Sequence, residues 1–360
     1  MTNKLIKIAL CLCIIAFSSC EKDDGPSGPI DIVIEGATAT PDVGGSNEEN
    51  QVYVDLSANT STTVQRDSWD LGFYSGSDFR VAINGSIYMA TAQLSSTDID
   101  VISSTTTEVQ DLQPQVAIGT FDADNMEFID APFGQITETA IEGISSTDSD
   151  NPVYLVNLGY EVGTEAAATG GVTVAGDARG WKKIRVLLDG NDYVLQYADL
   201  DDTTHQEVTI SKNSAYNFTF FSFNTESEVS VEPEKTDWDL NFTVFTNEIE
   251  GYGSYGYSDF VVTNTKGGAV SYKIDTETDT YTYEDFTLSD ALSIAFDNDQ
   301  RNIGSTWRVG GGPSSSPALI DTVFYIINDT AGNYYKMQFL AMYSDDGERG
   351  HPKFVYSLLQ

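Results

Sequence analysis

Few side chains in this 360-residue sequence could coordinate a metal or act as a nucleophile. The three cysteines, Cys11, Cys13 and Cys20, all lie within the first twenty residues. The rest of the chain therefore has no thiol for a disulfide, for a zinc or iron–sulfur site, or for covalent catalysis. The two histidines, His205 and His351, lie in polar turns, and so small a number disfavours a multi-histidine zinc site within one chain. No catalytic constellation is visible, so the sequence favours a binding protein over an enzyme.

Methionine and tyrosine supply the remaining candidates for binding a ligand. A thioether sulfur can ligate iron, and Met126 lies in an acidic, loop-like stretch where a methionine that only packs is less expected. Met89 is the second such candidate. The segment 251-257 alternates Gly with Tyr or Ser, and the rings of Tyr252 and Tyr255 could stack on a flat ligand or a sugar, or simply cover the edge of a sheet. Each methionine could instead be an apolar plug in the fold.

Acidic residues dominate the composition, with 55 Asp+Glu against 18 Lys+Arg and a formal net charge of -37. Nucleic acid is excluded as a ligand, because that binding needs clustered basic residues. Electrostatic attachment to anionic lipid heads is excluded for the same reason. Some acids cluster as calcium ligands do, but none forms the twelve-residue loop with its glycine and terminal glutamate. The clusters are Asp199 with Asp201 and Asp202, Asp297 with Asp299, and Asp345 with Asp346 and Glu348.

Short alternating runs separated by turn residues must position these candidates. From about residue 50 onward, apolar and polar residues alternate in runs such as 52-56, 218-223 and 336-340. This alternation is typical of half-buried antiparallel strands. The clearest helix candidate is 288-296, which Thr287 could cap. The sequence thus predicts an all-β fold with little helix.

The chain also repeats itself. Trp69-Asp70-Leu71-Gly72-Phe73 recurs 169 positions later as Trp238-Asp239-Leu240-Asn241-Phe242, and the run 153-156 recurs 170 positions later at 323-326. Such self-similarity predicts two tandem β domains, 49-212 and 213-360. The alternative is a single continuous β-sandwich with coincidental matches.

The N-terminus resembles a bacterial lipoprotein signal. Lys4 and Lys7 precede an apolar stretch, 8-17, that is too short for a permanent membrane helix and runs into Cys20. We expect a signal peptide over 1-19, acylation of Cys20, and a flexible tether over 20-48. The acids after Cys20 resemble the surface-export signal of Bacteroidota lipoproteins. This predicts an outer-membrane, surface-exposed protein that contacts the membrane only through its lipid anchor; the alternatives are an ordinary signal peptide and a plain linker.

The second copy resembles the HmuY family of haem-binding lipoproteins. Similar features occur in the family's order: the strand 216-223, Trp238-Asp239-Leu240, the turn residues 262-264, Trp307, the strand 323-327 and the aromatic strand 354-356. The resemblance covers nearly all of 213-360 and, more weakly, 49-200. It implies an all-β fold, an outer-membrane lipoprotein, and delivery of haem to a TonB-dependent receptor.

The resemblance also implies where haem iron would be held. Family members use paired His or paired Met from loops. The segment 122-128 resembles the family's first-ligand segment, with Asp124 where a His would sit and Met126 two residues on. The loop 308-313, where the second ligand is expected, has neither His nor Met. Met126 is therefore the first candidate for an iron ligand.

The sequence thus predicts a surface lipoprotein that binds haem or a related tetrapyrrole and passes it to an outer-membrane receptor. The candidate haem contacts are Met126, Met89, Tyr252 and Tyr255. Two alternatives stay open. One is a glycan-binding accessory lipoprotein of a nutrient-uptake system, and the other is a structural surface protein that has lost the haem site.

Overall fold

The structure is a computed structural model that describes residues 35–310 and 317–360. The predicted signal peptide, Cys20 and the first part of the predicted tether, up to residue 34, lie outside the described residues. The flexible tether predicted over 20-48 is wrong for its last part, because residues 36–39 form a strand that pairs with residues 354–357. Within the described ranges, no helix is both long enough and apolar enough to span a membrane.

Four antiparallel sheets contain most of the strands, which confirms the all-β prediction. Sheet A contains β1 (Gly36–Ala39), β22 (Arg349–Leu358), β21 (Tyr334–Tyr343), β20 (Val323–Asn328) and β17 (Val270–Asp275). Sheet B contains β16 (Gly253–Thr263), β15 (Leu240–Ile249), β2 (Asn50–Asp55) and β3 (Thr60–Gln65). Sheet C contains β14 (Ser227–Val229), β13 (Phe218–Ser222), β4 (Leu71–Tyr74) and β5 (Val81–Ile83). Sheet D contains β12 (Gln206–Ile210), β11 (Asp192–Asp199), β10 (Trp181–Asp189), β7 (Val153–Asn157) and β6 (Ala90–Gln93).

The remaining elements are short. Two further strand pairs are β8 (Tyr160–Val162) with β9 (Ala175–Ala178), and β18 (Arg308–Val309) with β19 (Ala318–Leu319). The helices are α1 (Thr107–Leu112), α2 (Leu288–Ala291) and the 3-10 turns η1 (Gly45–Asn47), η2 (Gly85–Ile87), η3 (Ile99–Val101), η4 (Ala123–Phe128) and η5 (Asp148–Asp150).

The helix predicted over 288-296 is wrong in length. Thr287 caps α2 as predicted, through a capping box with Asp290. The α-helix ends at Ala291, however, and Ser293 Oγ donates to the Asp290 carbonyl at 2.6 Å. Side-chain bonds of this kind compete with helix continuation.

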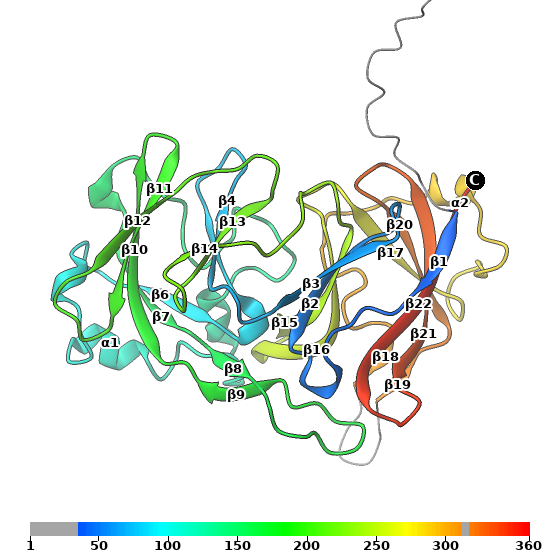
Figure 1. The fold of residues 1–360 in the computed structure, drawn as a ribbon, viewed down its shortest axis with the longest axis horizontal. Coiled ribbons are helices and arrows are strands. Elements are labelled where there is room, and N and C mark those ends of the chain that lie inside the picture. The colour runs from blue at the N-terminus through cyan, green and yellow to red at the C-terminus, as the bar shows by residue number, and fades with distance from the viewer. Residues whose placement is uncertain (1–34, 311–316) are drawn as a thin grey trace, which may run out of the picture. The chain divides into compact units, whose positions relative to one another are not determined.

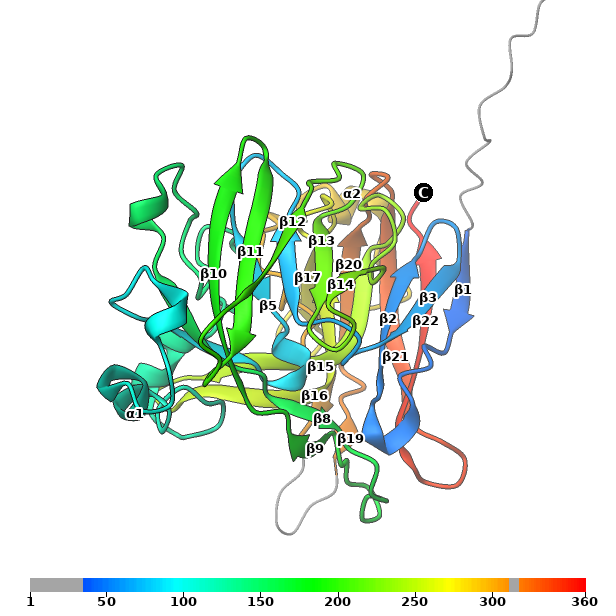
Figure 2. The same ribbon diagram turned by 60° about the vertical axis from the view of Figure 1, so that its left-hand side comes forward.

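The sheets pack in pairs. Sheets B and C lie between sheets D and A in both views of the ribbon (Figures 1 and 2). One apolar cluster joins sheets A and B, and a second joins sheets C and D. A smaller aromatic cluster joins sheets B and C at Tyr53, Trp69, Phe220 and Trp238.

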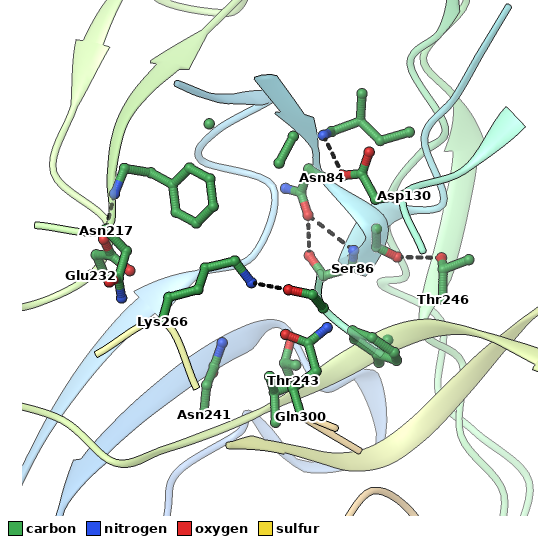
Figure 3. Close-up of a pocket in the computed structure, with 18 of the residues that line it drawn as sticks. Asn84, Ser86, Asp130, Asn217, Glu232, Asn241, Thr243, Thr246, Lys266 and Gln300 are labelled. Carbon is green, nitrogen blue, oxygen red and sulfur yellow. Dashed lines mark hydrogen bonds between the residues drawn. The ribbon is translucent and has the colours of Figure 1, made fainter. Parts of the chain in front are cut away.

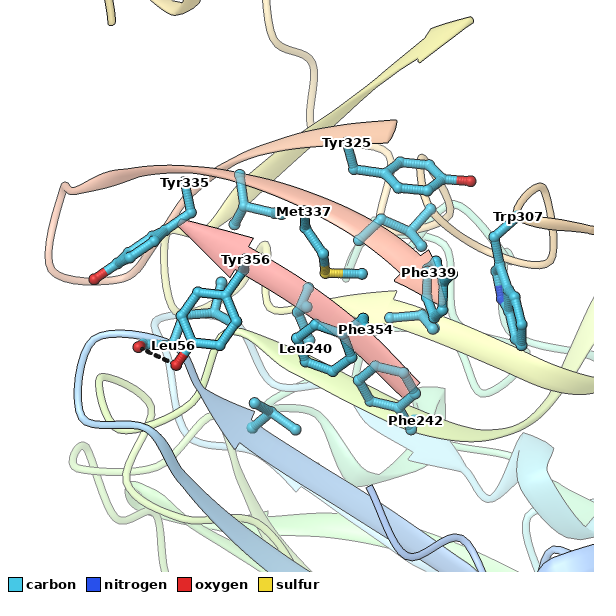
Figure 4. Close-up of a cluster of buried hydrophobic side chains, with 14 of the residues drawn as sticks. Leu56, Leu240, Phe242, Trp307, Tyr325, Tyr335, Met337, Phe339, Phe354 and Tyr356 are labelled. Atoms are coloured by element: carbon cyan, nitrogen blue, oxygen red, sulfur yellow. Dashed lines mark hydrogen bonds between the residues drawn. The ribbon is translucent and has the colours of Figure 1, made fainter. Parts of the chain in front are cut away.

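Aromatic rings fill the core between sheets A and B (Figure 4). The rings of Trp307 and Phe339 stack with centroids 4.1 Å apart, and Phe242 stacks on Phe354 at 5.5 Å. The buried hydroxyl of Tyr356 donates to the Leu56 carbonyl at 2.9 Å, so this ring is buried without losing its hydrogen bond. Burial of each such side chain stabilises the fold by roughly 1.5 to 3 kcal/mol.

Sheets B and C each combine strands from both predicted domains. The early hairpin β2–β3 pairs with β15, where Tyr53 lies opposite Asn241. The later hairpin β13–β14 pairs with β4, where Phe220 lies opposite Gly72. The two halves of the chain therefore exchange equivalent hairpins.

The two Trp-Asp motifs bind these exchanged hairpins in the same way. Asp70 donates its N–H to the Phe221 carbonyl at 2.9 Å and accepts from Phe223 N–H at 2.6 Å. Asp239 donates to the Val54 carbonyl at 2.8 Å and accepts from Leu56 N–H at 2.8 Å. Asn84 and Asn264 each donate from Nδ2 to the carbonyl of the preceding Trp, both at 2.8 Å. These matched contacts are what an internal repeat would produce.

The predicted division into 49-212 and 213-360 is crossed by both of these sheets. Residues Val33–Gln360 form one compact unit. The tandem repeat stays a prediction about the sequence, and the apolar cores do not divide at residue 212.

Candidate functional site

Two of the four predicted ligand contacts, Tyr252 and Tyr255, lie at the junction of β15 and β16, and a third, Met126, lies on η4. The turn packs on η4, which contains Met126. Ser254 N–H donates to Asn125 Oδ1 at 2.7 Å, and Gly119 N–H donates to the Ser254 carbonyl at 2.9 Å. Gly253 has a φ of +85°, and a side chain there would collide with the Asp122 carbonyl, so the turn requires glycine.

Aromatic rings are exposed at this contact. Phe121 is 63% exposed, Tyr252 59% and Tyr255 40%. The rings of Phe121 and Tyr255 lie 5.9 Å apart between centroids, tilted by 41°. We call Phe121, Tyr252 and Tyr255 the aromatic tip. Met126 is partly buried on η4, next in sequence to Asn125.

Met89 lies elsewhere. Its side chain is fully buried in the apolar cluster between sheets C and D, and it also reaches the wall of a cavity. This placement favours a packing role for Met89 over contact with a ligand.

The cavity has a volume of about 200 Å³ and lies between sheets B and C (Figure 3). Segments 129–139 and 262–266 border it. Aromatic side chains from both halves of the chain make up much of the wall: Tyr53, Trp69, Phe218, Phe220, Trp238 and Phe245. An apolar cavity with a few convergent polar groups is the usual form of a small-molecule site.

Lys266 is the basic residue of this cavity. It lies in the turn between β16 and β17, and its ammonium group donates to the Gly134 carbonyl at 3.1 Å. Its nitrogen also lies 5.8 Å from the centroid of the Phe218 ring. Burial lowers the pKa of Lys266, and the charges of Asp130 and Glu232 partly offset this effect.

The two carboxyl groups of the cavity are held by backbone donors. Asp130 accepts from Ile83 N–H and Ala140 N–H, both at 2.9 Å. Glu232 accepts from Phe218 N–H at 2.8 Å. Burial raises the pKa of Asp130 to about 6 and that of Glu232 to about 7, although these hydrogen bonds oppose the rise.

The two tryptophans of the cavity differ in hydrogen bonding. Trp69 Nε1 donates to Gln51 Oε1 at 2.9 Å. Trp238 Nε1 and Asn241 Oδ1 are buried and have no partner among the described residues. Buried polar groups nearly always have a partner, so each such exception requires an explanation.

A family model settles what kind of protein this is. The model described as "HmuY protein" matches residues 47–356. The chain belongs to the HmuY family. The match confirms the predicted resemblance and runs through both predicted domains as one span.

Two crystal structures of apo proteins are similar to the chain at low sequence identity. The HmuY analog TFO from Tannerella forsythia is 10% identical, with 92% of this chain and 100% of that chain covered and a TM-score of 0.24. PinO from Porphyromonas gingivitis is 13% identical, with 49% and 94% covered and a TM-score of 0.17. No curated protein matches the sequence.

The two histidines of this HmuY-family chain are bound to carboxylates. His205 Nδ1 lies 2.9 Å from Asp100 Oδ1, and His351 Nε2 lies 3.3 Å from Glu348 Oε2. Among the described residues, no group of three or more His, Cys, Asp or Glu side chains could hold a metal ion. The assignment of Met126 as the first candidate for contact with haem iron stays a prediction.

Sequence reasoning missed the cavity. Its polar residues come from separate turns and strands, and a single lysine in the Asn/Gly-rich turn 264–268 has no recognisable pattern. The repeated Trp-Asp motif was the available signal, because both tryptophans line the cavity.

Proposed function

We propose that this protein is a lipid-anchored, surface-exposed binding protein that captures haem or a related tetrapyrrole and passes it to a TonB-dependent outer-membrane receptor. Membership of the HmuY family supports the ligand class. Within the chain, the observation that carries the proposal is the contact between η4 and the β15–β16 turn. Asn125, the residue before Met126, accepts from Ser254 N–H, the residue before Tyr255.

The aromatic tip suits a flat ligand. Exposed rings offer faces on which a porphyrin can stack, and a thioether is an acceptable axial ligand of haem iron. Tyr252 and Tyr255 would contact the ring system, and Met126 would contact the iron. Cys20 would carry the acyl chains that hold the protein at the membrane.

A haemin titration of residues 21-360 tests this proposal. We expect a saturable, sharp Soret band. Met126→Leu keeps the apolar volume and removes the sulfur, so it should shift the band and weaken binding about tenfold, or about 1.4 kcal/mol. Tyr255→Ala should weaken binding without shifting the band.

Met342→Leu is the matched control, because Met342 is buried in the core between sheets A and B. It should leave the spectrum unchanged. A broad increase that does not saturate, or identical spectra for the wild type and Met126→Leu, would contradict the proposal.

A glycan ligand is the second candidate, and the exposure of Tyr252 and Tyr255 favours it. The same rings can stack on a sugar face. We would then expect the protein to be retained on a glycan array, Tyr252→Ala to lose this retention, and haemin to give no Soret band. This result would support glycan binding instead of haem binding.

A further inference from the structure

The cavity between sheets B and C is separate from the aromatic tip and lined by different residues. Of the predicted ligand contacts, only Met89 reaches it. We propose that this cavity is a second binding site, for a small aromatic molecule that carries a carboxylate. Lys266 would bind the carboxylate, and the aromatic wall would enclose the ring.

The volume limits the size of the ligand. An engineered cavity of about 150 Å³ binds benzene, and drug-sized ligands occupy about 300 to 1,000 Å³. At about 200 Å³, this cavity fits one aromatic ring with a short polar arm. A porphyrin is far larger, so the ligand of this site is not the proposed ligand of the aromatic tip.

The hydrogen bonding of Lys266 indicates a negatively charged ligand. An ammonium group has three protons to donate, and among the described residues Lys266 makes one hydrogen bond, to Gly134. No carboxylate of the described residues lies within ion-pair distance of it. Asp130 and Glu232 accept instead from backbone N–H groups. A ligand carboxylate would complete the coordination of Lys266 with charge-assisted hydrogen bonds.

Trp238 supplies a second donor. Its indole N–H is buried without a partner, whereas Gln51 pairs the N–H of Trp69. Gln51 lies two residues before Tyr53 on β2, and Phe218 lies two residues before Phe220 on β13. Tyr53 and Phe220 are the rings that pack on Trp238 and Trp69, respectively. Phe218 thus takes the place that Gln51 has in the first hairpin, and it cannot accept from Trp238.

Fluorine NMR with 4-fluorophenylacetate tests the proposal, with the neutral 4-fluorophenylacetamide as the comparison probe. We expect the carboxylate to bind saturably to the full chain and at least tenfold more tightly than the amide. Lys266→Met should remove this preference and weaken carboxylate binding at least tenfold. Trp238→Phe keeps an aromatic side chain but removes the pyrrole ring with its N–H, and should weaken binding several-fold.

Lys353→Met is the matched control, because Lys353 is exposed on β22, and it should bind like the wild type. Lys266→Gln is a second variant without the charge, in case Lys266→Met does not fold. Circular dichroism measures whether each variant is folded. No saturable binding of either probe, a preference for the amide, or equal binding by folded Lys266 variants would overturn the proposal. Haemin binding at the aromatic tip should be unchanged in Lys266→Met, so the proposals for the two sites can be contradicted independently of each other.

Discussion

Burial changes the pKa of a single residue, Glu232, and so makes stability depend on pH. The residue is 8% exposed, and burial raises the pKa of its carboxyl to about 7, well above the ordinary value of 4.5. The folded protein therefore holds this proton more tightly than the unfolded chain does. The contribution of Glu232 to stability is complete below about pH 4.5 and is lost as the pH rises through about 7. Asp239 behaves alike, because burial also raises its pKa to about 7.

Glu232→Gln should remove the part of this pH dependence that Glu232 contributes. A shift of one pKa unit corresponds to about 1.4 kcal/mol, so Glu232 lowers the free energy of unfolding by roughly 3 kcal/mol between pH 4.5 and pH 8. The glutamine stays neutral and still accepts from Phe218 N–H. Urea unfolding at pH 5 and pH 8 measures the difference between the variant and the wild type.

The control for this experiment is Glu234→Gln, since Glu234 is exposed two residues away. It should retain the pH dependence of the wild type. If Glu232→Gln loses as much stability as the wild type between the two pH values, the assignment to Glu232 is wrong.

The candidate site could be predicted from the sequence only in part. Residue type and local composition singled out Met126, Tyr252 and Tyr255 one by one. The segments that carry them are joined by the hydrogen bond between Asn125 and Ser254, which are 129 positions apart. No local sequence pattern encodes that contact. Lys266 was missed because its importance comes from the cavity around it.

The exchanged hairpins determine how the elements are held together. Each hairpin is bound by the aspartate of a Trp-Asp motif from the other half of the chain. Asp239 accepts from Leu56 N–H on one oxygen and from Thr330 N–H on the other, both at 2.8 Å. It therefore links the end of β2 to the loop after β20.

Asp239→Ala should destabilise the protein by roughly 2 to 3 kcal/mol, because it leaves the buried Leu56 N–H and the partly buried Thr330 N–H without acceptors. Guanidinium unfolding followed by tryptophan fluorescence measures this loss. Asp237→Ala is the control, because Asp237 is exposed, and it should change the stability by less than about 0.5 kcal/mol. Equal stabilities of the two variants would show that Asp239 does not hold the hairpin.

Strands were predictable where their partners were not. The runs 52-56 and 218-223 were predicted as half-buried strands, and the structure has β2 and β13 there. Both faces of β2 are buried at Val52, Tyr53 and Val54, and consecutive residues are also buried in β13, because each strand lies between apolar clusters on both sides. Alternation does not say which strand lies alongside. Hairpins usually pair with their sequence neighbours, and here β2 and β13 have one neighbour from the other half.

At the scale of the whole molecule, the chain from Val33 to Gln360 is one compact unit. A cut between the two predicted domains would separate strands that share sheets B and C. The halves should therefore depend on each other for folding, even if the sequence arose by duplication.

A protease site inserted after the exposed Asn213 tests this dependence. The cleaved protein should still elute as one particle in size-exclusion chromatography, because paired strands hold the halves together. Residues 35–212 expressed alone should lack the near-ultraviolet circular dichroism of a packed core. Two separately folded halves after cleavage would instead support independent domains.

The exchange of hairpins also constrains the order of events during protein synthesis. β2 ends at Asp55, and its partner strand begins at Leu240, 185 residues later. At about 5 to 20 residues per second, a ribosome needs about 10 to 40 s to make that length of chain. During this time the first hairpin has an unpaired edge, which the β15 of a neighbouring nascent chain could equally fill. The first strand waits longest, because Gly36 pairs with Ser357. Crowded synthesis should therefore produce intertwined dimers from this sequence.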